Sequence, residues 1–240
     1  MEKDHRQEII ENFNKNLIGL DDVFAFKCRE CGKCCKQRED ILLNSRDVYN
    51  IATALGMTHE QVIETHCEVY IGRDSRIPIV RLRPKGANRT CPLLVNNRCS
   101  VHLLKPTVCA LFPLGRGMVS EYASEDMGVG IPGEIQYILN STDCGSLKRK
   151  QTVRSWLEQF DISIEDSFFI KWNETMLTLV TAIHRFDGKN GVSNKLMSIL
   201  WDEIFAALYI DYNPQKKFYP QFEGNVGKII GIFTELMRLS

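Results

Sequence analysis

The sequence CRECGKCC, at residues 28–35, places four of the nine cysteines of this 240-residue chain within eight residues. Cys28, Cys31 and Cys34 follow a C-x2-C-x2-C spacing, and Cys35 comes immediately after them. A C-x2-C pair lies on one tight turn, so we expect the intervening backbone N–H groups to point at the sulfurs and stabilise thiolates. Thiolates at this density favour a soft, borderline or iron partner. The stretch therefore predicts metal ligation.

The residues between these cysteines fit the same interpretation. Gly32 can adopt a positive φ without a Cβ clash, which relieves the turn. The basic side chains Arg29, Lys33, Lys36 and Arg38 lie close in sequence and can partly offset the negative charge of the sulfurs.

The later cysteines are each predicted at a turn or a rigid loop, where a ligand can be aimed. They are Cys91 in TCPLL, Cys99 in RCSVH, Cys109 in KPTVCALFP and Cys144 in TDCGS. Cys67 differs, because it falls inside an apparent helix, EQVIETHCEVY, and has no partner at ligand spacing other than His66. We interpret it as a half-buried core thiol. His102, three residues after Cys99, could replace a cysteine as a ligand.

Without Cys67, eight sulfurs remain, which is two sets of four. Structural zinc and common iron–sulfur clusters both take four ligands. Neighbouring side chains diverge in most backbone conformations, so Cys34 and Cys35 rarely bind one tetrahedral ion together. We therefore expect two metal centres or one polynuclear centre. The alternative is that either Cys34 or Cys35 is a reserve or redox thiol.

The identity of the metal stays open between two candidates. The C-x2-C-x2-C spacing is typical of the start of a bacterial ferredoxin ligand run, although the usual C-x3-C-P continuation is absent. Zinc sites more often consist of separated C-x2-C knuckles, and only the first is clear here. The spacing favours an iron–sulfur cluster over zinc. A disulfide framework is disfavoured, because nine cysteines cannot all pair and cytosolic thiols stay reduced.

Composition indicates an ordinary globular protein. The chain has 30 basic and 30 acidic residues, so its net charge points to neither nucleic acid nor an anionic membrane as a partner. The polar N-terminal stretch lacks the apolar segment of a secretory signal. No apolar run reaches the roughly 18 residues of a transmembrane helix. We therefore expect a cytoplasmic location.

The pattern predicts an α+β fold with three parts. Residues 1–23 form an N-terminal helix, residues 24–145 an irregular cysteine-rich metal-binding domain with short strands and helices, and residues 146–240 a helical region. In the middle part we predict a helix from Ser45 to Gly56 and a second helix with a Thr58–Gln61 capping box. Strands are predicted in 77–84 and 134–139, with a turn at 95–97.

The last part contains three amphipathic segments. The first, SIEDSFFIKWNETMLTLVTAIHRF, has Ser163 as its expected N-cap, the second is SNKLMSILWDEIFAALYI, and the third covers 225–238. Their apolar faces imply a small bundle that packs on itself or on the cysteine region. These helices could also bind a protein partner.

Five features in order carry a resemblance to a known family. They are the C-x2-C-G-x-C-C run, CPLL, NRCSVH, KPTVCALFP and a distal cysteine, and together they resemble the YkgJ-like cysteine-cluster family over about residues 24–145. Its core is the CxxCxxCC domain, a zinc- or iron-chelating domain. The resemblance implies eight metal-binding cysteines: Cys28, Cys31, Cys34, Cys35, Cys91, Cys99, Cys109 and Cys144. Lys105–Pro106 stands where the family usually has Arg-Pro, which keeps the charge but loses a bidentate contact.

Three functions follow as hypotheses. The first is a metal-binding protein whose iron–sulfur cluster or zinc has a redox or structural role. The second is a metal-dependent enzyme, since the related flagellin lysine N-methylases share such a cysteine pattern. For this enzyme the glycines of PLGRG (residues 113–117), with Gly128 and Gly130, could form a flexible lid or ligand loop. The third is an interaction module held together by metal.

Overall fold

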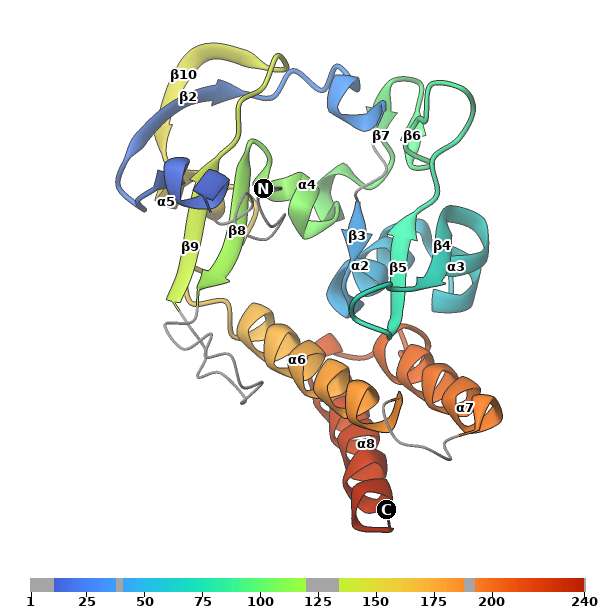
Figure 1. The fold of residues 1–240 in the computed structure, drawn as a ribbon. Coiled ribbons are helices and arrows are strands. Elements are labelled where there is room, and N and C mark those ends of the chain that lie inside the picture. The colour runs from blue at the N-terminus through green and yellow to red at the C-terminus, as the bar shows by residue number, and fades with distance from the viewer. Residues whose placement is uncertain (1–10, 38–40, 120–133, 188–192, 240) are drawn as a thin grey trace, which may run out of the picture. The chain divides into compact units, whose positions relative to one another are not determined.

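The computed structural model describes residues 11–37, 41–119, 134–187 and 193–239 (Figure 1). The chain forms two compact units, each drawn from two segments. Unit 1 comprises Met1–Cys34 and Thr107–Ser167, and unit 2 comprises Cys35–Pro106 and Phe168–Ser240. Small antiparallel sheets with short helices precede a mainly helical C-terminal region, which confirms the α+β class. The division into 1–23, 24–145 and 146–240 stays a prediction.

Unit 1 contains two small antiparallel sheets. One has the order β1-β9-β8, from Leu17–Ile18, Glu134–Leu139 and Leu114–Val119. The other pairs β2 (Val23–Lys27) with β10 (Ser146–Thr152), and these strands run side by side in Figure 1. The predicted strand at 134–139 is confirmed as β9.

The register of β2 and β10 determines where the cysteine motif lies. Val23 pairs with Thr152 at one end, and Lys27 pairs with Ser146 at the other. In an antiparallel pair the chain leaves one strand where it enters the other. Cys28 therefore leaves β2 beside Gly145, which precedes β10.

One apolar core holds unit 1 together, and two short helices contribute to it, α4 (Thr107–Leu111) and α5 (Val153–Glu158). The indole N–H of Trp156 donates a hydrogen bond to the backbone oxygen of Leu111 at 2.9 Å, so this buried polar atom is satisfied. The buried members of the core are Phe24, Phe26, Leu111, Leu114, Tyr137, Val153, Trp156 and Leu157.

Two glycines of PLGRG were predicted in a flexible loop, and this is wrong. Gly115 and Gly117 lie in β8. A Cβ at Gly117 would approach the ring of Phe13 to 2.8 Å, and one at Gly115 would approach Ile138 Cγ1 to 2.8 Å. The glycines are explained by close packing on the sheet. Gly128 and Gly130 lie outside the described residues.

Unit 2 contains a three-stranded sheet with the order β3-β5-β4, from Leu42–Leu43, Pro78–Leu82 and Cys67–Ile71. Side chains alternate along β5, with Pro78, Val80 and Leu82 buried. This period of two is the pattern that predicted the strand at 77–84.

The two helices beside this sheet begin at capping boxes. Helix α2 (Ser45–Leu55) starts after Asn44 and ends at Gly56, whose φ is 63°. Helix α3 (His59–His66) starts after Thr58, whose side chain accepts from the N–H of Gln61 at 3.3 Å. Each box satisfies N–H groups that a helix start leaves without partners. Both predicted helices are confirmed.

A tight hairpin follows in unit 2, formed by β6 (Leu94–Val95) and β7 (Arg98–Cys99). Asn96 and Asn97 form its turn with φ of 50° and 59°. Two successive positive φ values match the right-handed twist of hairpin strands, and asparagine tolerates them. The predicted turn at 95–97 is confirmed. A short 3-10 helix, η2 (His102–Leu104), comes next.

The C-terminal helices of unit 2 are α6 (Ser167–Asp187), α7 (Asn194–Phe205) and α8 (Phe218–Leu239), and a π-helix, η3 (Ala206–Ile210), extends α7. Figure 1 shows them in orange and red. Their apolar faces are buried, as the periodicity predicted. Buried members include Phe168, Leu179, Ile183, Leu200, Ile204, Leu208, Phe222, Val226, Ile229 and Phe233.

Several predicted boundaries are corrected. Helix α6 begins at Ser167, so Ser163 is not its N-cap; the intervening Asp166 instead accepts a hydrogen bond from the Arg116 guanidinium at 2.9 Å in unit 1. Helix α8 starts at Phe218, before the predicted residue 225. Of the N-terminal helix predicted at 1–23, residues 11–15 are helical, Leu17–Ile18 form β1 instead, and residues 1–10 lie outside the described ones.

No helix in the described part of the chain is both long and apolar enough to cross a bilayer.

His59 is a buried base without a hydrogen-bond partner on either ring nitrogen among the described residues. Its ring is 1% exposed and stacks on Tyr212, with centroids 5.3 Å apart, while Tyr49 lies on another side at 5.9 Å. Burial lowers the pKa of His59 to about 4, against a smaller opposing effect of Glu60. The native chain therefore holds His59 neutral.

We predict that His59 makes the native state sensitive to acid. From about pH 6.5 to pH 4 the unfolded chain binds a proton that the native imidazole does not, so stability falls with pH. The loss reaches about 3 kcal/mol. Urea unfolding of wild type and His59→Phe at pH 7 and pH 4.5 measures it. The difference in the free energy of unfolding between the two proteins at pH 7 measures the effect of the substitution on packing. An equal loss of stability from pH 7 to pH 4.5 in both proteins would contradict the prediction.

Candidate metal centre

The CRECGKCC stretch forms two successive turns in which the amides face the sulfurs. Glu30 and Gly32 have φ of 51° and 67°. The backbone N–H of Glu30 donates to Cys28 Sγ at 3.4 Å. A hydrogen bond from the backbone N–H of Lys33 is the main cause that lowers the pKa of the Cys31 thiol. The predicted amide-to-sulfur geometry is confirmed for both cysteines.

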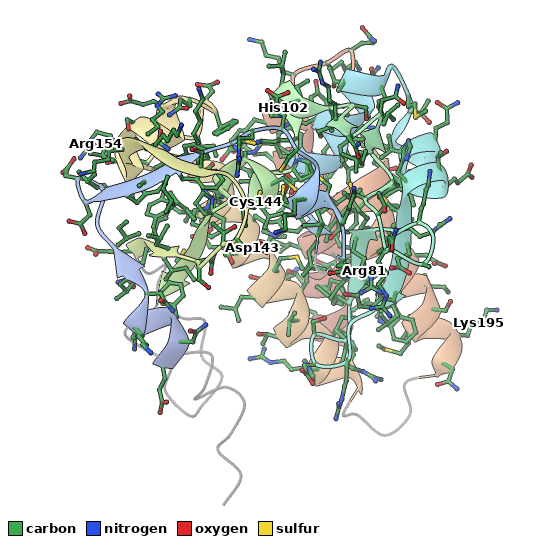
Figure 2. All side chains as sticks on the ribbon, turned by 90° about the horizontal axis from the view of Figure 1, so that it is seen from above. Arg81, His102, Asp143, Cys144, Arg154 and Lys195 are labelled. Atoms are coloured by element: carbon green, nitrogen blue, oxygen red, sulfur yellow. The ribbon has the colours of Figure 1, made fainter. Side chains whose placement is uncertain are left out.

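The distal cysteine lies on the loop between β9 and β10, where Figure 2 labels Asp143 and Cys144. The N–H of Cys144 donates to Thr142 Oγ1 at 3.0 Å, and Gly145 turns the chain into β10 with a φ of 79°. A Cβ at Gly145 would approach the Phe26 ring to 2.3 Å. Glycine is therefore required next to this cysteine by both conformation and space.

The structure brings Cys31 and Cys144 together, 113 residues apart in sequence. Their Sγ atoms are 3.9 Å apart. Two contacts without sulfur join the same loops. Lys33 Nζ lies 2.6 Å from Asp143 Oδ2, and the Arg29 guanidinium donates to the backbone oxygen of Gly145. The sulfur pair therefore lies within a connected pair of loops.

Three sulfurs of unit 1 influence one another's ionisation through their charge. Burial raises the pKa of the Cys144 thiol to about 11, and the negative charge of Cys34 adds to the increase. A hydrogen bond from the backbone N–H of Cys34 acts in the opposite direction. The negative charge of Cys34 also opposes ionisation of Cys31. Thiolates whose charges act on one another in this way repel, and a bound cation would relieve that repulsion.

Lys33 supplies a positive charge beside these sulfurs. Its pKa is raised mainly by Asp143, with smaller contributions from Cys144 and Cys31. The sequence indicated Lys33 and Arg29 but not Asp143, whose only signal was its position beside Cys144. Arg38 lies outside the described residues.

Cys34 and Cys35 are the last two residues of a 3-10 helix, η1 (Lys33–Cys35), and the division between the compact units falls between them. The Cys34 N–H bonds to the sulfur of Cys144, in unit 1. The Cys35 backbone oxygen accepts a hydrogen bond from the N–H of Cys91 at 2.8 Å, in unit 2. Each of the adjacent cysteines is thus tied through its backbone to a cysteine of its own unit.

Unit 2 gathers a second group through its backbone. The backbone oxygen of Cys91 accepts from the N–H of Leu94 at 3.1 Å, and Leu94 pairs with Cys99 across the β6–β7 hairpin. Cys35, Cys91 and Cys99 are therefore neighbours along one connected path. His102 follows in η2 of the same unit.

Two cysteines have surroundings that differ from the prediction. Cys109 lies within α4 of unit 1, on a short helix that follows Pro106, and not on a loop. Cys67 is the first residue of β4, not part of a helix, and is fully buried. Burial raises the pKa of its thiol to about 12, so it remains protonated. Its interpretation as a core thiol is confirmed.

All nine cysteines lie within the described residues, and none is joined in a disulfide bond. In the described part of the chain, no group of three or more His, Cys, Asp or Glu side chains is assembled closely enough to hold a metal ion. The structure brings the sulfurs of Cys31 and Cys144 close together in unit 1, and backbone contacts connect Cys35, Cys91 and Cys99 within unit 2. The eight-ligand set remains a prediction.

Comparison with known proteins identifies the segment that contains the motif. Residues 27–129 match the model of the CxxCxxCC family, which is described as "Putative zinc- or iron-chelating domain". No curated protein and no solved structure gave a match. Cys144 lies beyond the matched residues.

We predict that Gly145→Ala disrupts the loop that carries Cys144. An alanine there would have to adopt a left-handed φ, at about 1–2 kcal/mol, and would also collide with the buried Phe26 ring. Gly86→Ala is the matched control, because Gly86 has a φ of 68° but no atom within 4 Å of the added Cβ. Urea unfolding should show a clearly larger loss for Gly145→Ala. Equal losses would mean that the Phe26 contact is unimportant.

Proposed function

We propose, from the CxxCxxCC domain in residues 27–129, that this chain is a metal-binding protein in which cysteine thiolates hold zinc or iron in unit 1. The observation that supports it best is the separation of 3.9 Å between Cys31 Sγ and Cys144 Sγ. Two thiolates on one tetrahedral ion, each at about 2.3 Å, lie about 3.8 Å apart. The pair therefore fits two adjacent ligand positions of one ion.

The donors proposed for this centre are Cys28, Cys31, Cys34 and Cys144. All four belong to unit 1. The first two receive backbone hydrogen bonds on sulfur, and the charge of Cys34 acts on both Cys31 and Cys144. Four thiolates are a common set for structural zinc and for iron.

Three further family cysteines, Cys35, Cys91 and Cys99, all lie in unit 2 and suggest a second group of ligands. Cys109 belongs to unit 1 and is not assigned to this group. Two groups agree with the expectation that Cys34 and Cys35, as neighbours, bind different ions. The backbone contacts of each residue with its own unit support this assignment.

The role proposed for the first centre is structural. The loops at 28–34 and 143–145 have few apolar side chains, so a bound metal would supply free energy of folding there. An iron–sulfur cluster would also supply electron transfer. The C-x2-C-x2-C spacing keeps the cluster as the second candidate, whereas the close sulfur pair favours a single ion.

No specific observation supports either of the other two hypotheses, the metal-dependent enzyme and the interaction module. The glycines of PLGRG, which could have formed a ligand loop in a methyltransferase, are instead part of β8. The apolar faces of α6, α7 and α8 are buried in unit 2 itself, which accounts for their hydrophobic pattern without a partner.

We predict that the chain contains zinc or iron when it is purified without oxygen. Metal analysis and the visible spectrum separate the candidates, because zinc thiolates absorb no visible light and iron–sulfur clusters do. A colourless, zinc-containing protein supports the single ion. A protein that contains no metal and acquires neither zinc nor iron when these are added under reducing conditions would contradict the proposed function.

We also predict that Cys31 and Cys67 differ in their effect on metal. Cys31→Ala should weaken binding by more than the roughly 10- to 100-fold typical of a lost outer-shell partner. Cys67→Ala should leave metal stoichiometry unchanged and cost about 1 kcal/mol of stability, because it removes one buried sulfur. Metal titration and urea unfolding of both variants test this. Comparable metal loss in the two variants would show that the donor set is wrong.

A further inference from the structure

We propose that Cys31 and Cys144 are a peroxide-reactive dithiol that closes to a disulfide. Their Sγ atoms are 3.9 Å apart. A disulfide bond is about 2.05 Å long, so the sulfurs must approach by about 2 Å for the bond to form. The metal release described below rests on the proposed function, but disulfide formation itself does not.

Contacts without sulfur connect the two loops that carry this pair. Lys33 is ion-paired with Asp143 at 2.6 Å, and Arg29 donates to the backbone oxygen of Gly145. Behind them, Lys27 pairs with Ser146 in the sheet of β2 and β10. Cys31 and Cys144 are thus presented to each other by the fold.

Exposure distinguishes Cys31 from the other eight thiols of the chain. Cys31 is exposed, so a small oxidant reaches its sulfur directly. Cys28, in the same motif, packs against the apolar core of unit 1. Cys67 is fully buried. Oxidation should therefore begin at Cys31, with Cys144 as the resolving thiol.

The chemistry balances with hydrogen peroxide as the oxidant. The Cys31 thiolate attacks one peroxide oxygen, the O–O bond breaks, and a sulfenic acid and hydroxide form. The Cys144 sulfur then attacks the sulfenic sulfur, the S–O bond breaks, and a second hydroxide leaves. With the two thiol protons, the products are one disulfide and two waters. Two electrons pass from sulfur to peroxide, and a dithiol reductant reverses the change.

Disulfide formation would remove two of the four proposed donors from unit 1 at once. A metal held by Cys28 and Cys34 alone loses half of its ligands and should be released. The site would then hold metal in reducing conditions and release it after exposure to peroxide.

The sequence permits a direct test by trypsin digestion. Lys and Arg flank the cysteines so that Cys31 is alone in the peptide ECGK (Glu30–Lys33), and Cys144 is alone in residues 117–148. Cys28 falls in the dipeptide CR, and Cys34 with Cys35 in CCK. The intact, full-length chain, with and without bound zinc, is treated with hydrogen peroxide, its remaining thiols are blocked, and the digest is examined by mass spectrometry.

The expected result is ECGK disulfide-linked to 117–148, several-fold more abundant than any other linked pair and lost on reduction. Cys144→Ser should abolish the linked peptide, whereas Cys28→Ser, in the same motif, should keep it. Linkage of 117–148 to CR or CCK instead, or oxidation of Cys31 to sulfinic acid without a disulfide, would overturn the proposal.

Zinc content measured on the same samples separates this inference from the proposed function. A linked peptide in a chain that never binds zinc or iron supports the dithiol and contradicts the metal centre. Zinc that leaves on peroxide treatment without the linked peptide contradicts the dithiol and leaves the metal centre standing. Zinc release in step with the linked peptide, reversed by reductant and added zinc, supports both.

Discussion

The antiparallel pairing of β2 with β10 is the constraint on which the candidate site depends. It sets Lys27 opposite Ser146, and so places the start of the cysteine motif beside the end of the loop that carries Cys144. The contacts from Arg29 to Gly145 and from Lys33 to Asp143 extend that pairing beyond the strands. The distance of 3.9 Å between Cys31 Sγ and Cys144 Sγ is the outcome of these contacts.

Local features of the fold could be predicted because their causes are local. The Thr58–Gln61 capping box, the stop at Gly56 and the two asparagines of the β6–β7 turn involve only residues close in sequence. The amides that face Cys28 and Cys31 are equally local, which is why C-x2-C spacing indicated them. Apolar periodicity likewise located the C-terminal helices, since a buried face repeats along the chain.

Features that depend on distant residues were missed. Cys67 follows a helix and looked helical, but its backbone pairs with Leu82 of β5. Gly115 and Gly117 looked like loop glycines, yet their small size serves packing against Ile138 and Phe13. Local sequence patterns could not predict that each unit is built from two separate segments, because the pairing of strands more than 100 residues apart determines it. Asp143 was missed for the same reason.

The central claim is that Cys31 and Cys144 bind one metal ion in unit 1. X-ray absorption at the metal edge tests it most directly, on the intact chain purified without oxygen and on Cys144→Ser. The account predicts a shell of sulfur alone, at about 2.3 Å, in the intact chain and the appearance of an oxygen or nitrogen neighbour in the variant. A shell dominated by oxygen and nitrogen in the intact chain, or an unchanged sulfur shell in Cys144→Ser, would contradict it.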